Sequence, residues 1–133
     1  MIVTSTRDPA LRTSFLDAAA RNAPADGGLY LPTELAPLAD LPALLALPFA
    51  ERSTEILFRL LAPELTRDEV AAMVGAALDF PVVYRELSPE LSVLELFHGP
   101  TLSFKDFGVR FLAQVLARLR ERAAGRGEGE RRT

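Results

Sequence analysis

The chain contains no cysteine, which excludes disulfide bonds and thiolate metal sites, and we expect no metal site of any kind. It also lacks a long apolar run. The most apolar stretch, residues 41–49, contains Pro42 and Pro48 and is too short to cross a bilayer. Residues 1–8 lack the charged-then-apolar order of a signal peptide. We therefore expect a cytoplasmic protein without a membrane segment.

Lysine is almost absent as well. The chain carries 15 basic residues, and Lys105 is its only lysine. The net charge of −3 predicts no general attraction to nucleic acid or to an anionic membrane. A lysine that persists in an arginine-rich chain can be held by chemistry that arginine lacks, because lysine can lose its proton and form a Schiff base. Composition alone leaves chance as an equal explanation.

Helix signals dominate the first half of the chain, which is long enough for one modest domain with its own core. Ser14 can serve as a helix N-cap, with Asp17 in the first turn, where a carboxylate suits the helix dipole. Thr66 followed by Glu69 has the form of a capping box. Prolines divide the segment between these caps into short helices. The expected helices span residues 14–22, 49–61 and 66–79.

Short extended segments and turns accompany these helices. Residues 2–4 and 29–31 are each expected to form a short extended segment, because the first is β-branched and the second ends at a proline. Asp26-Gly27-Gly28 predicts a turn, because glycine supplies positive φ at little cost. Further along, residues 82–87 and 93–97 predict two more strands.

The segment from Val93 to Leu119 has the order strand, tight loop, helix, with Lys105 at the helix start. There the helix dipole disfavours a positive charge and so favours the neutral, nucleophilic amine. Free amide groups of the first turn would also favour a nearby anion such as phosphate. Asp106 and Ser103 can cap this terminus. A solvated surface charge is the plainer explanation of a lysine here, as long as only these local signals are considered.

Three parts of the sequence resemble the threonine synthase family. The run from Leu94 to Gly108, LELFHGPTLSFKDFG, is similar to the lysine motif of the microbial enzymes. Ser5-Thr6-Arg7 and residues 23–32, APADGGLYLP, resemble the N-terminal signature of that family, and Phe80-Pro81 also fits. The resemblance covers nearly the whole chain, in order and with comparable spacing. Its lysine motif is long and specific.

This resemblance implies an α/β enzyme whose mostly helical N-terminal subdomain, with a few short strands, leads into the first strand–loop–helix of a fold like the β subunit of tryptophan synthase. Lys105 would be the catalytic residue and would hold pyridoxal 5′-phosphate as a Schiff base. The reaction would convert O-phospho-L-homoserine and water to L-threonine and phosphate. Ser103 is a further cofactor-binding candidate, or else a helix cap. His98 is another, or else it orders the loop through a backbone hydrogen bond.

The resemblance also implies an N-terminal fragment, because the family's Ser-Gly-Asp-Thr-Gly segment and the loop that cradles the cofactor phosphate do not occur in this sequence. We expect a subdomain over 1–81, the start of the pyridoxal-phosphate-binding body over 82–124 and a disordered tail over 125–133. Alone, the chain is expected to be inactive, to expose apolar surface along the lysine helix and to need the C-terminal part as its partner. A threonine synthase-like phospho-lyase and a non-catalytic remnant are the alternative interpretations.

Overall fold

A three-stranded antiparallel sheet holds the N-terminus in the computed structural model, which describes residues 1–130, the last five as backbone only. Strand β1 (Ile2–Ser5) is central, between β2 (Arg12–Ser14) and β3 (Tyr30–Pro32). The register pairs Val3 with Thr13 on one side and with Pro32 on the other. The two segments expected to be extended are thus confirmed as β1 and β3, whereas β2 was not predicted from the sequence.

Three of the first four helices lie where the sequence predicts them. Helix α1 (Phe15–Arg21) starts after Ser14, whose hydroxyl accepts the Asp17 N–H, and α2 (Leu41–Ala46) is the short helix after it. Helix α3 (Phe49–Leu61) has the predicted bounds. Helix α4 (Arg67–Ala77) opens with both hydrogen bonds of the capping box between Thr66 and Glu69. These ends form where predicted because each depends on side chains only three residues apart.

Glu64 joins the sheet to the helices. Its Oε1 accepts hydrogen bonds from the N-terminal ammonium group at 2.9 Å and from the Phe15 N–H at 3.1 Å. Its Oε2 accepts a hydrogen bond from the Leu16 N–H at 2.9 Å. A carboxylate is favourable at this place, because the first amide groups of α1 have no partner within the helix. Glu64 therefore holds the start of α1 from a position about fifty residues further along the chain.

The lysine helix, α5, runs from Lys105 to Glu130 and begins at the residue where the sequence predicts its start. Residues 125–130, the start of the expected disordered tail, continue this helix. Extending a formed helix adds one hydrogen bond per residue, and arginine and glutamate are good helix formers despite the glycines between them. Residues 131–133 of the predicted tail lie outside the described part of the chain. Among the helices of residues 1–130, none is both long enough and apolar enough to span a membrane.

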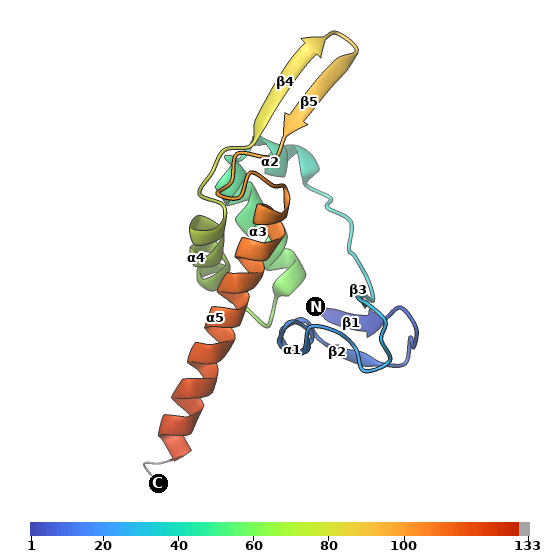
Figure 1. The fold of residues 1–133 in the computed structure, drawn as a ribbon, viewed down its shortest axis with the longest axis vertical. Helices are drawn as coiled ribbons and strands as arrows, with labels where there is room; N and C mark the ends of the chain where they lie inside the picture. Colours follow the sequence, from blue (N-terminus) through green and yellow to red (C-terminus); the bar gives the residue numbers. More distant parts are fainter. Residues whose placement is uncertain (131–133) are drawn as a thin grey trace.

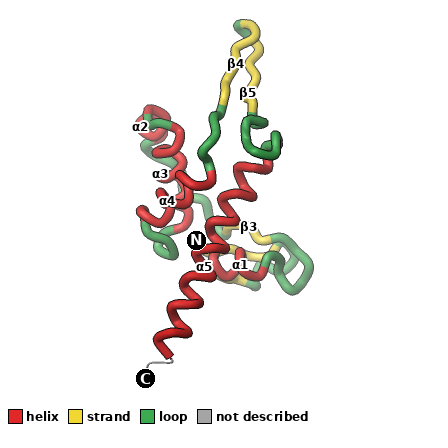
Figure 2. The backbone as a smooth tube through the Cα atoms, turned by 60° about the vertical axis from the view of Figure 1, so that its left-hand side comes forward, coloured by secondary structure: helices red, strands yellow, loops and turns green. Residues whose placement is uncertain are grey.

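The hydrophobic core lies where α3, α4 and α5 meet, and α1 also contacts α5. Figure 2 shows these helices between two small groups of strands. Val115 is the α5 residue that is wholly buried there. The buried members of the core are Leu61, Leu65, Val70, Met73, Val74 and Val115.

Beyond the helices, strands β4 (Val83–Ser88) and β5 (Leu91–Glu95) form an antiparallel hairpin that projects from the body of the molecule (Figure 1). Tyr84 pairs with Leu94 across it, and both side chains are exposed. The predicted strands are confirmed, with ends shifted by one or two residues. The strand–loop–helix order before and after Lys105 is confirmed as well, and with it the mixed α/β fold.

Candidate functional site

Lys105 is exposed at the first position of α5. Its neighbours Leu102 and Phe104 are also exposed, with 74% and 64% of their surface open to solvent. Among the residues whose side chains the structure describes, none forms an ion pair with its ammonium group. The Lys105 amine is therefore accessible to solvent and lies beside apolar side chains. Such an amine is the nucleophile with which a carbonyl-bearing cofactor forms a Schiff base.

The loop before Lys105 is folded around the carboxylate of Asp106. The Thr101 N–H donates to Asp106 Oδ2 at 2.9 Å, and the Thr101 hydroxyl donates to Asp106 Oδ1 at 2.8 Å. A turn from Gly99 to Leu102 closes the loop, with the Leu102 N–H 3.0 Å from the Gly99 carbonyl oxygen. Asp106 is 5% exposed. It was predicted to cap the helix, but its side chain instead turns back to the loop.

The environment of Asp106 favours its charged form. Burial, the largest influence, raises the pKa of Asp106, but the hydrogen bonds from the Thr101 N–H and hydroxyl, followed by the charge of Arg110, act against it, and the net effect lowers the pKa. The carboxylate is therefore ionised at neutral pH and keeps all its acceptor sites for the loop.

The first amide groups of α5 have partners inside the loop. The Lys105 N–H donates to Ser103 Oγ at 3.3 Å, and the Asp106 N–H donates to the Ser103 carbonyl oxygen at 3.0 Å. The Phe107 N–H donates to the Phe104 carbonyl oxygen at 3.3 Å. Ser103 therefore caps the helix, which is one of the two roles predicted for it. The expected anion site is not available at these three amides, because each already has an acceptor.

His98 is held by a carboxylate. Its Nε2 lies 2.7 Å from Glu95 Oε2, and Arg85 pairs with the other oxygen of Glu95. The hydrogen bond from His98, followed by that from Arg85, lowers the pKa of Glu95 against the opposing effect of burial. His98 was expected to order the loop through a backbone hydrogen bond. Its partner is instead a side chain, that of Glu95 at the end of β5. The cofactor contact of His98 stays a prediction.

The N-terminal signature residues bind one another. Asp26 Oδ1 accepts the Ser5 hydroxyl and the Gly28 N–H, each at 2.9 Å, and Gly27 has a φ of 73°. The Ser5 bond, followed by that of Gly28, lowers the pKa of Asp26. Arg7 Nη1 donates to the Asp26 carbonyl oxygen at 2.9 Å. This segment is the predicted turn, and hydrogen bonds from Ser5 and Arg7 to Asp26 hold it against the end of β1.

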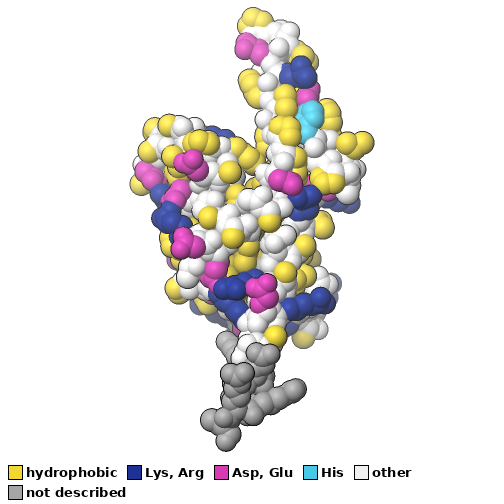
Figure 3. Space-filling model, turned by 90° about the vertical axis from the view of Figure 1, so that its left-hand side faces the viewer, with side chains coloured by type: hydrophobic (Ala, Val, Ile, Leu, Met, Phe, Trp, Pro, Cys, Tyr) yellow, Lys and Arg dark blue, Asp and Glu magenta, His cyan; other side chains and the backbone are white. Residues whose placement is uncertain are grey.

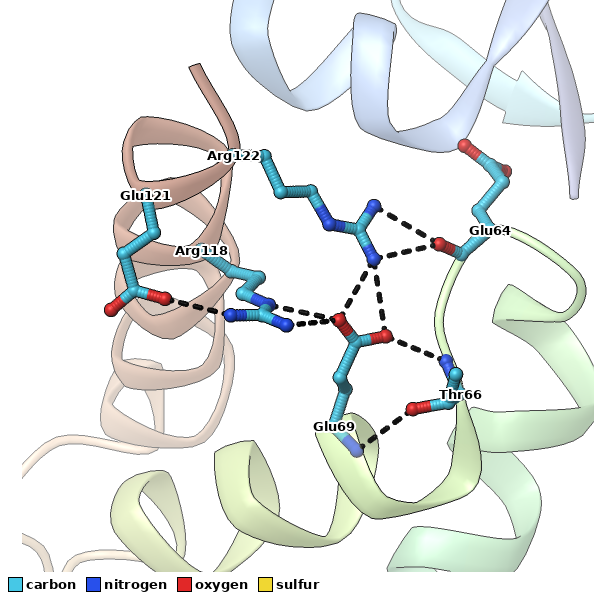
Figure 4. Close-up of polar contacts among 6 residues, drawn as sticks. All are labelled: Glu64, Thr66, Glu69, Arg118, Glu121 and Arg122. Carbon is cyan, nitrogen blue, oxygen red and sulfur yellow. Dashed lines mark hydrogen bonds and ion pairs between the residues drawn. The ribbon is translucent and has the colours of Figure 1, made fainter. Parts of the chain in front are cut away.

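Glu69 anchors the lysine helix, and the sequence did not indicate this (Figure 4). Its carboxylate accepts bonds from Arg118 at 2.6 and 2.8 Å and from Arg122 at 2.9 and 3.1 Å. The Thr66 N–H bond is the largest cause that lowers the pKa of Glu69, to about 2, and the two arginines add to it. Glu121 pairs with Arg118 further out. The capping box was a local signal, but its arginine partners lie about fifty residues away.

A second anchor lies at the opposite end of α4. Arg110, in the second turn of α5, donates from Nε to the Ala77 carbonyl oxygen at 2.8 Å and from Nη2 to that of Ala76 at 2.9 Å. It also pairs with Asp79 at 2.6 Å. A cation suits the C-terminus of a helix, where the last carbonyl groups lack partners. Both ends of α4 are therefore tied to α5, which fixes the helix that begins with Lys105.

Comparisons with known proteins agree on one family. Residues 3–78 match the family described as Threonine synthase N terminus. Threonine synthase of Haemophilus influenzae is 41% identical over 114 residues, which are 86% of this chain and 27% of that protein. The Escherichia coli enzyme is 36% identical over 110 residues, or 81% of this chain and 26% of its own length. The chain thus spans about a quarter of the length of these relatives.

Solved structures carry the same similarity. The crystal structure of threonine synthase from Escherichia coli aligns with a TM-score of 0.84 and 35% identity, over 89% of this chain and 28% of that one. Threonine synthase from Brucella melitensis, solved with pyridoxal phosphate bound, aligns with a TM-score of 0.80 and 33% identity over the same shares. The fold of this chain is therefore shared with part of each of these solved threonine synthases.

Proposed function

The chain belongs to the threonine synthase family, whose N-terminal region it carries, and on this premise we propose that Lys105 is the attachment residue for pyridoxal phosphate. One observation carries the proposal: the only lysine of the chain lies in the run LELFHGPTLSFKDFG, which resembles the lysine motif of the family, and it is exposed at the start of α5. The exposed Leu102 and Phe104 beside it suit a flat aromatic ligand. The relative from Brucella melitensis binds this cofactor.

The proposed reaction of the whole protein is that of a carbon–oxygen lyase of threonine biosynthesis, in the cytoplasm. O-Phospho-L-homoserine and water yield L-threonine and phosphate: the bond from the γ-carbon to the phosphate oxygen breaks, and water adds at the β-carbon. Bound pyridoxal phosphate would supply the electron sink for carbanion chemistry. Lys105 is the group of this chain that would hold the cofactor and then carry protons near the reacting carbons.

The surface of α5 supports a partner for this chain. Val109, Leu112 and Leu116 are 62%, 40% and 38% exposed, and they form a second apolar face beside the one that packs on α4. A helix that is apolar on two faces is typical of a buried helix. The part of the family fold that this chain does not span is the partner that we propose for this face. Without that part, the chain is expected to be inactive.

The projecting hairpin fits the same partner. A two-stranded hairpin is at best marginally stable by itself in water. Hydrophobic side chains lie among charged ones along the projecting hairpin in Figure 3. Its exposed apolar residues are Tyr84, Leu87, Leu91, Val93 and Leu94. Contact with the remainder of the fold would cover them and hold β5 in place before the lysine loop.

The test of the proposed function is a chimaera in which this chain replaces the matching quarter of the Haemophilus influenzae relative. We expect it to release phosphate from O-phospho-L-homoserine and to form threonine. Lys105→Arg keeps the charge but cannot form the Schiff base, so it should lose at least about a thousandfold in rate. Phosphate release without threonine would favour a related phospho-lyase. Equal rates for the Lys105→Arg chimaera would refute the assignment of Lys105.

A further inference from the structure

The loop before Lys105 has almost no freedom around Asp106. A Cβ atom on Gly99 would collide with Asp106 Oδ2, so no larger residue fits there without movement. Leu102 has a φ of 56°, a left-handed conformation that is costly for any residue with a Cβ atom and more so for a bulky one. This backbone strain persists because the two bonds from Thr101 to the Asp106 carboxylate fix the loop.

Asp106 and Lys105 face different ways although they are adjacent. Successive residues of an α-helix are turned by about 100° around its axis. With Asp106 buried against the loop at 5% exposure, Lys105 is turned outward and is exposed. The packing of α5 on α4 sets the rotation of the helix, and the bonds from Thr101 to the Asp106 carboxylate hold the loop against its first turn, from which Lys105 faces solvent.

We propose that Asp106 is a positioning residue, which fixes the loop from Gly99 to Phe104 and thereby the direction in which the Lys105 amine presents the cofactor. The proposal rests on the proposed function of Lys105 and adds a residue that need not touch the cofactor. Thr101 is its partner, since it supplies both hydrogen bonds. We call the two hydrogen bonds from Thr101 to the Asp106 carboxylate the clamp. Without the clamp, the Lys105 amine should still react with the cofactor, but its direction should no longer be fixed.

The test uses the same chimaera, loaded with pyridoxal phosphate, and reads two signals. Borohydride reduction followed by peptide mass measurement shows whether Lys105 carries the cofactor. Circular dichroism in the cofactor absorption band shows whether the bound cofactor has one fixed orientation. The variants are Asp106→Asn, which loses the charge and one acceptor site, and Thr101→Val, which loses the hydroxyl but keeps the N–H. Thr101→Ser keeps both groups, and Asp17→Asn is a control carboxylate in the first turn of α1.

We expect Asp106→Asn and Thr101→Val to remain labelled on Lys105 but to lose most of the dichroism signal. Thr101→Ser and Asp17→Asn should keep both signals. Unchanged dichroism in Thr101→Val and Asp106→Asn would overturn the positioning role while the label on Lys105 stands. No label on Lys105 in the parent chimaera would instead refute the proposed function, and this inference with it. An Asp106→Asn protein that does not fold leaves Thr101→Val to decide.

Discussion

Replacing Glu69 by glutamine removes the charge that ties α4 to the lysine helix while keeping the shape of the side chain. The pKa of Glu69 is lowered from its ordinary value of 4.5 to about 2. Each pKa unit corresponds to about 1.4 kcal/mol, so the full effect would be about 3 kcal/mol. Arg118 and Arg122 are 40% and 33% exposed. Screening by water therefore reduces the expected loss of stability to about 1–2 kcal/mol at pH 7.

The sign of the pH dependence follows from the lowered pKa. Glu69 binds its proton less tightly in the folded chain than in the unfolded chain, so its contribution is complete above about pH 4.5 and is lost as the pH falls toward 2. Urea unfolding of wild type and Glu69→Gln, followed by circular dichroism at pH 7, 5 and 3.5, measures the difference. The gap between the two should be largest at pH 7 and clearly smaller at pH 3.5.

Glu121 provides the matched control. It pairs with Arg118 as well, but it is 65% exposed. Glu121→Gln should therefore change the free energy of unfolding by less than about 0.5 kcal/mol. An equal cost for Glu121→Gln and Glu69→Gln, or a loss at Glu69 that is the same at every pH, would contradict this role of Glu69.

Three further predictions follow from packing. Val115→Ala should cost about 2 kcal/mol because Val115 is wholly buried in the core, whereas Val109→Ala, at an exposed site, should cost under about 0.5 kcal/mol in the same urea titration. Gly75→Ala should raise stability by about 0.5–1 kcal/mol, since a Cβ there meets nothing within 4 Å inside a helix. Gly99→Ala should abolish the cofactor dichroism of the chimaera, because its Cβ would collide with the Asp106 carboxylate. A Gly99→Ala protein with the parent's dichroism would contradict the clamp.

Local signals in the sequence were sufficient for most elements. The caps at Ser14 and Thr66 depend on neighbours three residues away, so they could be read without knowledge of the fold. Strand β2 was missed, because its three residues carry no apolar pattern and pair only once β1 is in place. The helical continuation to Glu130 was not predicted, because residues 125–130 are glycine and charge without an apolar anchor, although they extend a helix that is already formed.

Contacts between residues that lie far apart in the chain could not be predicted from the sequence. The lysine motif located Lys105, but the direction of Asp106 depends on a loop that had to be folded before its bonds could be seen. The pairing of Glu69 with Arg118 and Arg122 joins two helices about fifty residues apart, and many alternative partners existed among 15 basic residues. A single sequence does not rank such partners, because each arginine offers the same donors.

The most direct test of the account is the mass of the peptide that contains Lys105 after pyridoxal phosphate and borohydride are added to the chimaera. The account predicts one reduced cofactor on that peptide and none on the N-terminal amine, which is paired with Glu64. Lys105→Arg should carry no cofactor. A parent chimaera that is folded but unlabelled at Lys105, or labelled elsewhere to the same extent, would contradict the central claim.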